Sequence, residues 1–346
     1  MSLTEQEILD TPLALAHTYK YFEEKGETLR RFFAQHTHRR FVFLGCGSSF
    51  MLAKGAAALF QSFPDTAACA IPAGDYIVNP LFWREAARGS IIVTLSRSGR
   101  TTEMVRAVKT MKETLGSPVI SLSMEGNNDI TPMSDLDLIM DWCYDHSVCQ
   151  TRTVTNLYAA TLLLAAAYSG DEALACAVRT ACESNADFMA ENRPALERLA
   201  ALPWDNVVVL ADGPISGIAE EGALAFTEIS MLTGRYFHLL DYRHGPIVIS
   251  GAKTLTLMLL APTDEMLQGP MVNDVMKHGG PVITVSQDAG NPYGATEHIR
   301  IKGLCSFAAW GIPFVYLAQM LALMKAMVLG GNPDAPAGLD PYITLS

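Results

Sequence analysis

An internal repeat constrains the fold of this chain more than any other feature of its sequence. Residues 206–213 (NVVVLADG) resemble residues 40–47 (RFVFLGCG), and residues 281–286 (PVITVS) resemble residues 118–123 (PVISLS) at nearly the same spacing. Self-similarity at a fixed spacing is the mark of a duplicated unit. We therefore expect two similar domains, joined near 171–203, where helix-forming residues dominate.

Apolar runs typical of strands alternate with helical patterns through the first half of the chain. Strands are expected at 39–44, 68–71, 90–95, 117–123 and 136–142, and helices at 4–34, 50–60, 82–87, 103–113 and 156–167. The run 254–260 is the second-half counterpart of 90–95. Such alternation predicts an α/β fold, with a parallel sheet covered by helices on both faces.

Length and composition narrow the classes of function. At 346 residues the chain is long for one core, and 49% hydrophobic against 18% charged residues indicates a globular protein with a large interior. The net charge of −11 argues against a nucleic-acid partner and against anionic membranes. Local hydrogen-bond donors would therefore have to hold an anionic substrate.

Cysteine usage and the chain's apolar runs predict a cytoplasmic protein. The seven cysteines are odd in number and form no C-x-x-C pair, which favours reduced thiols. No Cys/His cluster has zinc-site spacing, so we expect neither a metal nor another cofactor. The start of the sequence is acidic and polar, unlike a secretory signal. The apolar run 315–329 contains Gln319 and Lys325, which favours a buried helix.

A strand-to-helix junction in the first half offers an anion site. The strand expected at 90–95 is followed by hydroxyls and a glycine, and then by the helical pattern at 103–113; these junction residues are Ser96, Ser98, Gly99, Thr101 and Thr102. Free N–H groups and the positive end of the helix dipole bind anions at such a junction. The alternative is an ordinary Ser/Thr helix cap. The second-half counterpart places Pro262, Asp264 and Glu265 where an anion would need donors.

Candidates for proton transfer lie in the second half. Glu228 follows a helical pattern and has Phe226, Ile229 and Leu232 as close neighbours in the sequence. Apolar surroundings raise the pKa of a carboxyl group towards the value that suits a general base near neutral pH. His244 lies in a turn beside a Gly-Pro pair. A surface glutamate and a structural histidine are the alternatives.

Four motifs in this order resemble those of the SIS (sugar isomerase) phosphosugar-binding family. They are GCGSS at 45–49, SRSGRT at 96–101, EGAL at 221–224 followed by Glu228, and RHGP at 243–246. The pattern is most similar to fructosamine-6-phosphate deglycases, to the isomerase part of glucosamine-6-phosphate synthase and to galactosamine-6-phosphate deaminase/isomerases. It extends from about residue 39 to about residue 339.

The resemblance implies two tandem SIS domains in one subunit, each a doubly wound, flavodoxin-like parallel sheet, and a homodimer. The corresponding division is amino-terminal helices at 1–38, a phosphate-binding domain at 39–170, a helical linker at 171–203, a catalytic domain at 204–330 and a tail at 331–346.

The resemblance also implies roles for individual residues. The phosphate of a sugar phosphate would be held by Ser49, Ser96, Arg97, Ser98 and Thr101, and the rest of the substrate by Gly47, Ser48, Gln150 and Glu221. Glu228 would move protons between C1 and C2. His244 would handle ring opening, from the partner subunit in a site at the subunit interface.

Departures from the synthase pattern point to a different reaction. We expect no glutaminase domain before the SIS region, Ala225 stands where the synthase pattern has a lysine on the glutamate helix, and residues 336–341 contain no lysine. An amine-bearing substrate would supply the nitrogen that such a lysine lends. We therefore favour a deglycase or deaminase of a ketosamine 6-phosphate. A plain aldose–ketose isomerase and a non-catalytic phosphosugar sensor are the alternatives.

Overall fold

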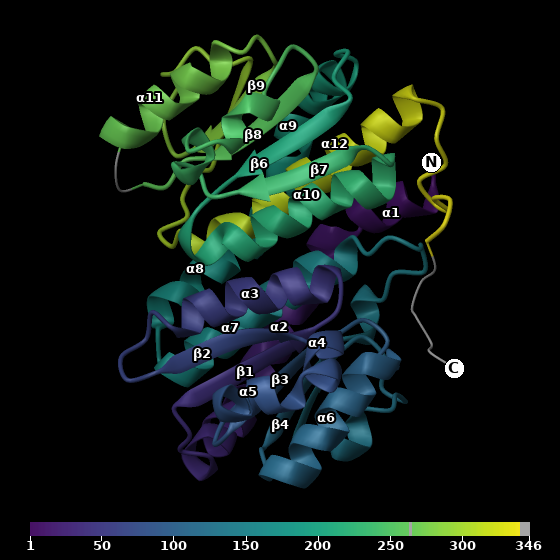
Figure 1. Cartoon of the computed structure of the whole chain (residues 1–346), viewed down its shortest axis with the longest axis vertical. Helices are drawn as coiled ribbons and strands as arrows, with labels where there is room; N and C mark the ends of the chain where they lie inside the picture. Colours follow the sequence, from purple (N-terminus) through teal and green to yellow (C-terminus); the bar gives the residue numbers. More distant parts are fainter. Residues whose placement is uncertain (263–264, 340–346) are drawn as a thin grey trace.

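The computed structural model describes residues 1–262 and 265–339 and contains two parallel five-stranded sheets, each flanked by helices. Figure 1 shows the two sheets stacked along the long axis, with β1 to β4 in the lower half and β6 to β9 in the upper half. The α/β prediction is therefore confirmed.

The first half follows two helices at the start of the chain. Its elements, with those helices, are α1 (Leu3–Leu9), α2 (Thr11–Gln35), β1 (Arg40–Gly45), α3 (Ser48–Phe60), β2 (Ala67–Pro72), α4 (Ala73–Val78), α5 (Pro80–Ala87), β3 (Ile91–Ser96), α6 (Thr102–Leu115), β4 (Val119–Ser123), β5 (Leu136–Ile139) and α7 (Arg152–Ser169). The strand order is β2-β1-β3-β4-β5, and all pairs are parallel.

The second half repeats this order. Its elements are α8 (Glu172–Glu183), α9 (Asn185–Ala200), β6 (Asn206–Leu210), α10 (Ser216–Ser230), β7 (Thr233–Phe237), β8 (Thr254–Leu259), α11 (Glu265–Met276), β9 (Val282–Ser286), β10 (Glu297–Arg300) and α12 (Gly311–Val328). Read from β7, the order β7-β6-β8-β9-β10 matches that of the first sheet. Both are the 2-1-3-4-5 order of doubly wound folds.

The central strands are apolar because both faces of each sheet are covered. Every residue of β3 and of β8 is buried, as expected for a parallel sheet between helical layers. Alternate β1 residues face two separate clusters: Phe41 and Phe43 pack with α3, whereas Val42 and Leu44 pack with α6. The helices α3 and α6 therefore lie on opposite faces of the first sheet.

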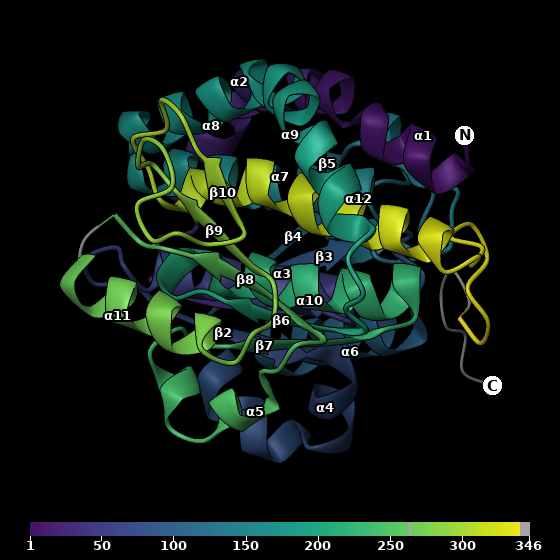
Figure 2. The same cartoon turned by 90° about the horizontal axis from the view of Figure 1, so that it is seen from above.

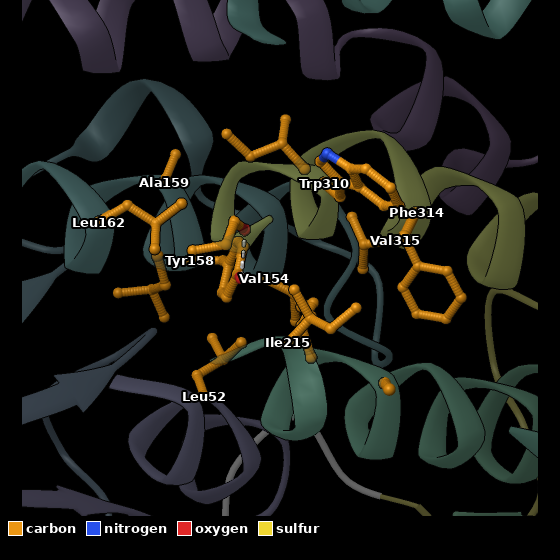
Figure 3. Packing of buried hydrophobic residues seen from close by; sticks show 14 of the residues in the cluster. Leu52, Val154, Tyr158, Ala159, Leu162, Ile215, Trp310, Phe314 and Val315 are labelled. Atoms are coloured by element: carbon orange, nitrogen blue, oxygen red, sulfur yellow. Dashed lines mark hydrogen bonds between the residues drawn. The ribbon is translucent and has the colours of Figure 1, made fainter. Parts of the chain in front are cut away.

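The two halves pack together through α3 and α10. A Cβ atom added at Gly217 of α10 would collide with the backbone of Gly55 and Met51 on α3, so the absence of side chains at this crossing permits the close approach. Beside it, Lys54 Nζ lies 2.7 Å from a carboxylate oxygen of Glu220. Figure 3 shows the neighbouring core, where Leu52 of α3 and Ile215, just before α10, point towards residues of α7 and α12.

Helix α12 is the apolar centre of this core. It packs against α10 and α9 and runs through the middle of the molecule in Figure 2. The segment Ala308–Val328 is long and apolar enough to cross a membrane, but 83% of its most apolar window is buried inside the protein. The sequence prediction of a buried helix here agrees with this packing.

Three expectations about local structure need correction. The helical pattern at 4–34 is divided into α1 and α2 at Asp10, because Pro12 at the start of α2 cannot donate a helical hydrogen bond. The strand expected at 136–142 ends at Ile139, and a short 3₁₀ turn follows. Strand β7 was not expected, since Thr233–Phe237 is a polar, partly exposed edge strand containing a glycine.

Candidate active site

A cavity of about 160 Å³ opens at the carboxyl ends of β1 and β3. These neighbouring strands lead into α3 and α6, which leave to opposite faces of the sheet. Such a switch point leaves a crevice where α/β proteins bind ligands. The cavity is lined by Cys46, Gly47, Ser48, Ser49, Leu95, Ser96, Arg97, Ser98, Thr101, Met104, Val148, Gln150, Glu228 and Leu339.

The turn between β1 and α3 forms one wall. Gly47 has a φ of +54°, a left-handed conformation that an L side chain rarely adopts. Ser48 and Ser49 are the first two residues of α3, and both line the cavity, where their hydroxyls can donate to a ligand. This wall therefore presents hydrogen-bond donors to the cavity.

The turn between β3 and α6 forms the facing wall. The hydroxyl of Ser96 accepts a hydrogen bond from Gly99 N–H (2.9 Å), and the hydroxyl of Ser98 accepts one from Arg100 N–H (3.2 Å). Each hydroxyl keeps its own hydrogen for donation to a ligand. Gly99 has a φ of +61°, and a Cβ there would collide with Asn128. The turn that the sequence singled out therefore lines the cavity with hydroxyl donors, with Thr101 at the N-cap of α6, and its binding of an anion stays a prediction.

A loop at 144–151 forms the rear wall and is held by Arg97. The Arg97 side chain is 3% exposed. Its Nη1 donates to the carbonyl oxygen of Ser147 at 2.8 Å, with longer contacts to those of Asp145 (3.3 Å) and Val148 (3.4 Å). Gln150, from the same loop, lines the cavity with a side-chain carbonyl that has no hydrogen-bond partner among the described residues.

The second half contributes Glu228 to this cavity. Glu228 lies in the last two turns of α10, and burial raises its pKa to about 6, while the positive charge of Arg97 acts in the opposite direction. A carboxyl group with such a pKa is ionised near neutral pH yet basic enough to accept a proton. The cavity therefore joins the hydroxyl-lined turns of the first half to a carboxylate of the second.

Glu221 lies two helical turns before Glu228, behind the cavity. It is 1% exposed, and burial raises its pKa well above the usual value, with the charge of Glu228 as a second cause. A hydrogen bond to Ser48 acts in the opposite direction. Glu221 is not among the residues that line the cavity, although its hydrogen-bond partner Ser48 is, so its contact with a substrate stays a prediction.

His244 does not lie at this cavity. It is an exposed residue in the turn that follows β7, whereas Glu228 lies on α10 just before β7 begins. The five-residue strand between them spans roughly 13 Å. Within one chain, His244 and Glu228 are therefore at opposite ends of the second sheet.

Several lining residues were not anticipated as site residues. They are Cys46, Leu95, Met104, Val148 and Leu339. Burial raises the pKa of the Cys46 thiol to about 11, which agrees with an unreactive thiol. Apolar lining residues carry no chemical signature of their own, so only their position in the fold identifies them. Leu339 belongs to the tail, whose residues 340–346 are outside the described part.

Two other expectations concern metal binding and the second-half turn. Among residues 1–262 and 265–339, no group of three or more His, Cys, Asp or Glu residues has metal-binding geometry. In the second-half turn, the amide of Gln268 donates to Ala261 O (2.9 Å) and accepts from Ala261 N (2.7 Å). Asp264 and the side chain of Glu265, which were expected to repel an anion there, are outside the described part of the structure.

Comparison with known families assigns the first half of the molecule. The SIS domain model matches residues 36–167, which include the first sheet and the turns at 45–49 and 96–101. The chain therefore contains a SIS domain at residues 36–167.

Three similar proteins extend over the whole chain. The glutamine–fructose-6-phosphate aminotransferase (isomerizing) of Photorhabdus laumondii is 25% identical over 99% of this chain, which spans only 58% of that relative. Two crystal structures share the fold: glucosamine-6-phosphate deaminase of Thermotoga maritima (TM-score 0.81, 22% identity, 99% of this chain and 100% of that one) and tagatose-6-phosphate ketose/aldose isomerase of Escherichia coli (TM-score 0.87, 20% identity, 100% and 96%).

Proposed function

We propose that this protein is an enzyme that processes a phosphosugar by acid–base catalysis. One observation carries the proposal: the hydroxyl-lined crevice of the first sheet and the carboxylate of Glu228, with a pKa of about 6, share one cavity. The first element suits a phosphate group and the second suits proton abstraction from a carbon next to a carbonyl.

The phosphate is proposed to bind between the two helix N-termini. Ser49 from one wall and Ser96, Ser98 and Thr101 from the other present hydroxyl donors, and Arg97 adds a positive charge. Because the net charge is −11, this local arrangement has to provide the attraction for a dianion. Phosphate held here would extend the sugar towards Glu228, with Gln150 accepting a hydrogen bond from a sugar hydroxyl.

The second half is proposed to be a second SIS domain. Its strand order is that of the first half, and its sequence repeats two strands of it. This supports the division into helices at 1–38, domains at 39–170 and 204–330, a linker at 171–203 and a tail at 331–346. In this division the second domain contributes Glu228 to the cavity of the first domain.

The preferred reaction is removal of the amine from a ketosamine 6-phosphate. Glu228 takes a proton from C1, which carries the nitrogen, and a proton is delivered to C2. The C2 oxygen gains a proton while the nitrogen loses one, so that C2 becomes a hydroxyl-bearing carbon and C1 becomes an imine. Water then hydrolyses the imine to an aldose 6-phosphate and a free amine. Positioning by the remote phosphate would direct the substrate's binding energy to this step.

The absence of a lysine supports an amine-bearing substrate. No lysine lines the cavity in the described part of the chain, and none occurs in the sequence after Lys325. The substrate's own nitrogen would replace a Schiff base formed on the protein. Similarity to the Thermotoga protein named glucosamine-6-phosphate deaminase is in keeping with release of an amine.

His244 is proposed to act from the partner subunit of a homodimer. It is exposed and at the far end of the second sheet from Glu228, so it could reach a cavity of this kind only in a second copy of the chain. There it would handle ring opening of the sugar.

An aldose–ketose isomerase is the second candidate. The same carboxylate could move a proton between C1 and C2 of a sugar that carries no amine, and the Escherichia coli structure of the same fold is named a ketose/aldose isomerase. A non-catalytic sensor would also need the phosphate turn but would not need Glu228.

The experiment is a panel of ketosamine 6-phosphates, amino-sugar phosphates and plain ketose phosphates, with product detection by mass spectrometry. The proposal predicts an aldose 6-phosphate and a free amine from at least one ketosamine. Interconversion of unaminated sugars without amine release would favour the isomerase. Tight binding of sugar phosphates with no turnover of any of them would favour the sensor.

A further inference from the structure

The carboxylate of Glu7 holds the loop behind the cavity. Glu7 lies on α1 and is 2% exposed. Its Oε1 accepts hydrogen bonds from His146 N–H (2.6 Å) and Ser147 N–H (3.2 Å), and its Oε2 accepts one from the Ser147 hydroxyl. One side chain thus fixes two successive residues that are about 140 positions away in the sequence.

Ser147, which is bound to Glu7, is also hydrogen-bonded to Arg97. Ser147 is bound to Glu7 through its N–H and its hydroxyl, and its carbonyl oxygen accepts the 2.8 Å hydrogen bond from Arg97 Nη1. Val148, the next residue, lines the cavity. A displacement of this segment would therefore move both the rear wall and the guanidinium group.

Arg97 connects the loop to the reactive end of the cavity. It follows Ser96 in the proposed phosphate turn, and its charge acts on Glu228. The other ionisable groups close to Glu228 are Glu221 on the same helix and the Cys149 thiol of the loop. Of these three groups near Glu228, Arg97 is the one that carries a positive charge.

We propose that Glu7 is a positioning residue, which fixes residues 145–148 so that Arg97 stands against Glu228 and the phosphate turn. Glu7 does not line the cavity and acts through Ser147 and Arg97. An effect of Glu7 on turnover rests on the proposed function. Its effect on the positions of Arg97 and of the loop does not depend on that function.

The role of Glu7 is one of hydrogen-bond acceptance. Among the described residues no cation lies within 4.0 Å of its carboxylate, and the ionisable group that it influences is Asp145, whose pKa burial raises to about 6 with Glu7 contributing. A glutamine could accept both backbone N–H groups with its oxygen and donate to the Ser147 hydroxyl, which could then turn its one hydrogen to Cys149 O, 2.8 Å away. Glutamine should therefore substitute for glutamate here.

The test compares Glu7→Ala, Glu7→Asp and Glu7→Gln in the full-length chain. Two readouts need no turnover: the pKa of the Glu228 carboxyl, from ¹³C NMR, and the affinity for inorganic phosphate, from calorimetry. With Ala we expect the pKa of Glu228 to rise by roughly half a unit and phosphate affinity to fall about tenfold, because Arg97 loses its fixed position. The Asp variant should shift the pKa of Glu228 and the phosphate affinity in the same directions as Ala. The Gln variant should leave the pKa of Glu228 unchanged and the phosphate affinity within about twofold of the wild type.

A merely structural role gives a different pattern. If the folded Ala variant melts at a lower temperature but keeps the wild-type pKa of Glu228 and phosphate affinity, the positioning role is wrong. Should the Ala variant fail to fold, the Asp variant decides in the same way. If the wild type processes no sugar phosphate or does not bind phosphate, the proposed function fails, and the NMR titration still decides the role of Glu7.

Discussion

The two halves of this molecule have the same strand order but different turns at their switch points. After β3 the first half has the hydroxyls of Ser96 and Ser98 around Gly99, and these turn residues border an open cavity. After β8 the second half has Ala261, whose N–H and carbonyl are both occupied by the side chain of Gln268. In the proposed function the first turn binds an anion, whereas in the described part of the second turn the Ala261 N–H is already paired with Gln268.

Both halves contribute residues to one cavity, and in the proposed function they have different roles there. The second half keeps the fold and contributes the carboxylate of Glu228, which α10 carries across to the first half's crevice. The close crossing of α3 and α10 at Gly55 and Gly217 makes that delivery possible. Two halves with the same strand order therefore line one cavity with different side chains.

The largest effect is expected from Glu228→Gln. We expect turnover to fall by about 10³-fold or more, because a carboxamide cannot accept the proton, while sugar-phosphate affinity changes little. Single-turnover kinetics together with calorimetry separate the two effects. A Gln variant with near wild-type turnover would show that the Glu228 carboxylate of the second half takes no part in the reaction.

A double substitution, Ser49→Ala with Ser98→Ala, tests the first half's turns. Each lost hydroxyl that bonds a charged phosphate should cost about 1.5–2 kcal/mol, so phosphate affinity should fall roughly 100-fold or more. The matched control is Gln268→Ala in the second half, which should lower the melting temperature and leave phosphate affinity unchanged. An equal loss of affinity in the control would break the comparison.

The contact between the halves is tested by Gly217→Ala. The new Cβ would collide with backbone atoms of α3 that cannot move aside, so we expect a stability loss of about 2–3 kcal/mol and lower turnover as α10 shifts. The control is Gly222→Ala on the same helix, where the Cβ would meet Phe314 and Ala318 side-chain atoms at 3.0–3.1 Å. We expect a smaller loss there, measured by urea unfolding, and the reverse order would contradict the account.

The smallest effect is a dependence of stability on pH. The pKa of Glu228 is about 6 in the folded chain against 4.5 ordinarily, so its contribution to stability is fully present below pH 4.5 and is lost as pH rises through 6. The loss amounts to about 2 kcal/mol. Glu228→Gln avoids this loss, so its stability relative to the wild type should increase by about that amount between about pH 4 and pH 8 in urea unfolding. A constant difference across this range would mean that the carboxyl group is not buried as described.

The first half of the site was predictable because its signal is local. The apolar run of β3, the hydroxyls after it and the helical pattern of α6 are contiguous, and the fold only brings them beside the similar turn after β1. The α/β class followed in the same way from apolar runs and from the repeat of strands β1 and β4 in β6 and β9.

The rest of the site depends on contacts between distant segments, which leave no local pattern in the sequence. Glu7 meets Ser147 across 140 positions, and neither residue looks unusual in its own segment. The place of Glu228 depends on the packing of α3 against α10, so the neighbouring sequence gave only the direction of its pKa shift. Its proposed role came from the family motif. The catalytic roles of Glu228 and His244 stay predictions.

The most direct test of the central claim is a crystal structure of the Glu228→Gln variant with fructose 6-phosphate. The account predicts phosphate bonded to hydroxyls of the 96–101 turn, with C1 and C2 within about 4 Å of the substituted side chain. Phosphate bound at the Ala261 turn, or sugar carbons farther than about 8 Å from residue 228 in every subunit, would contradict it.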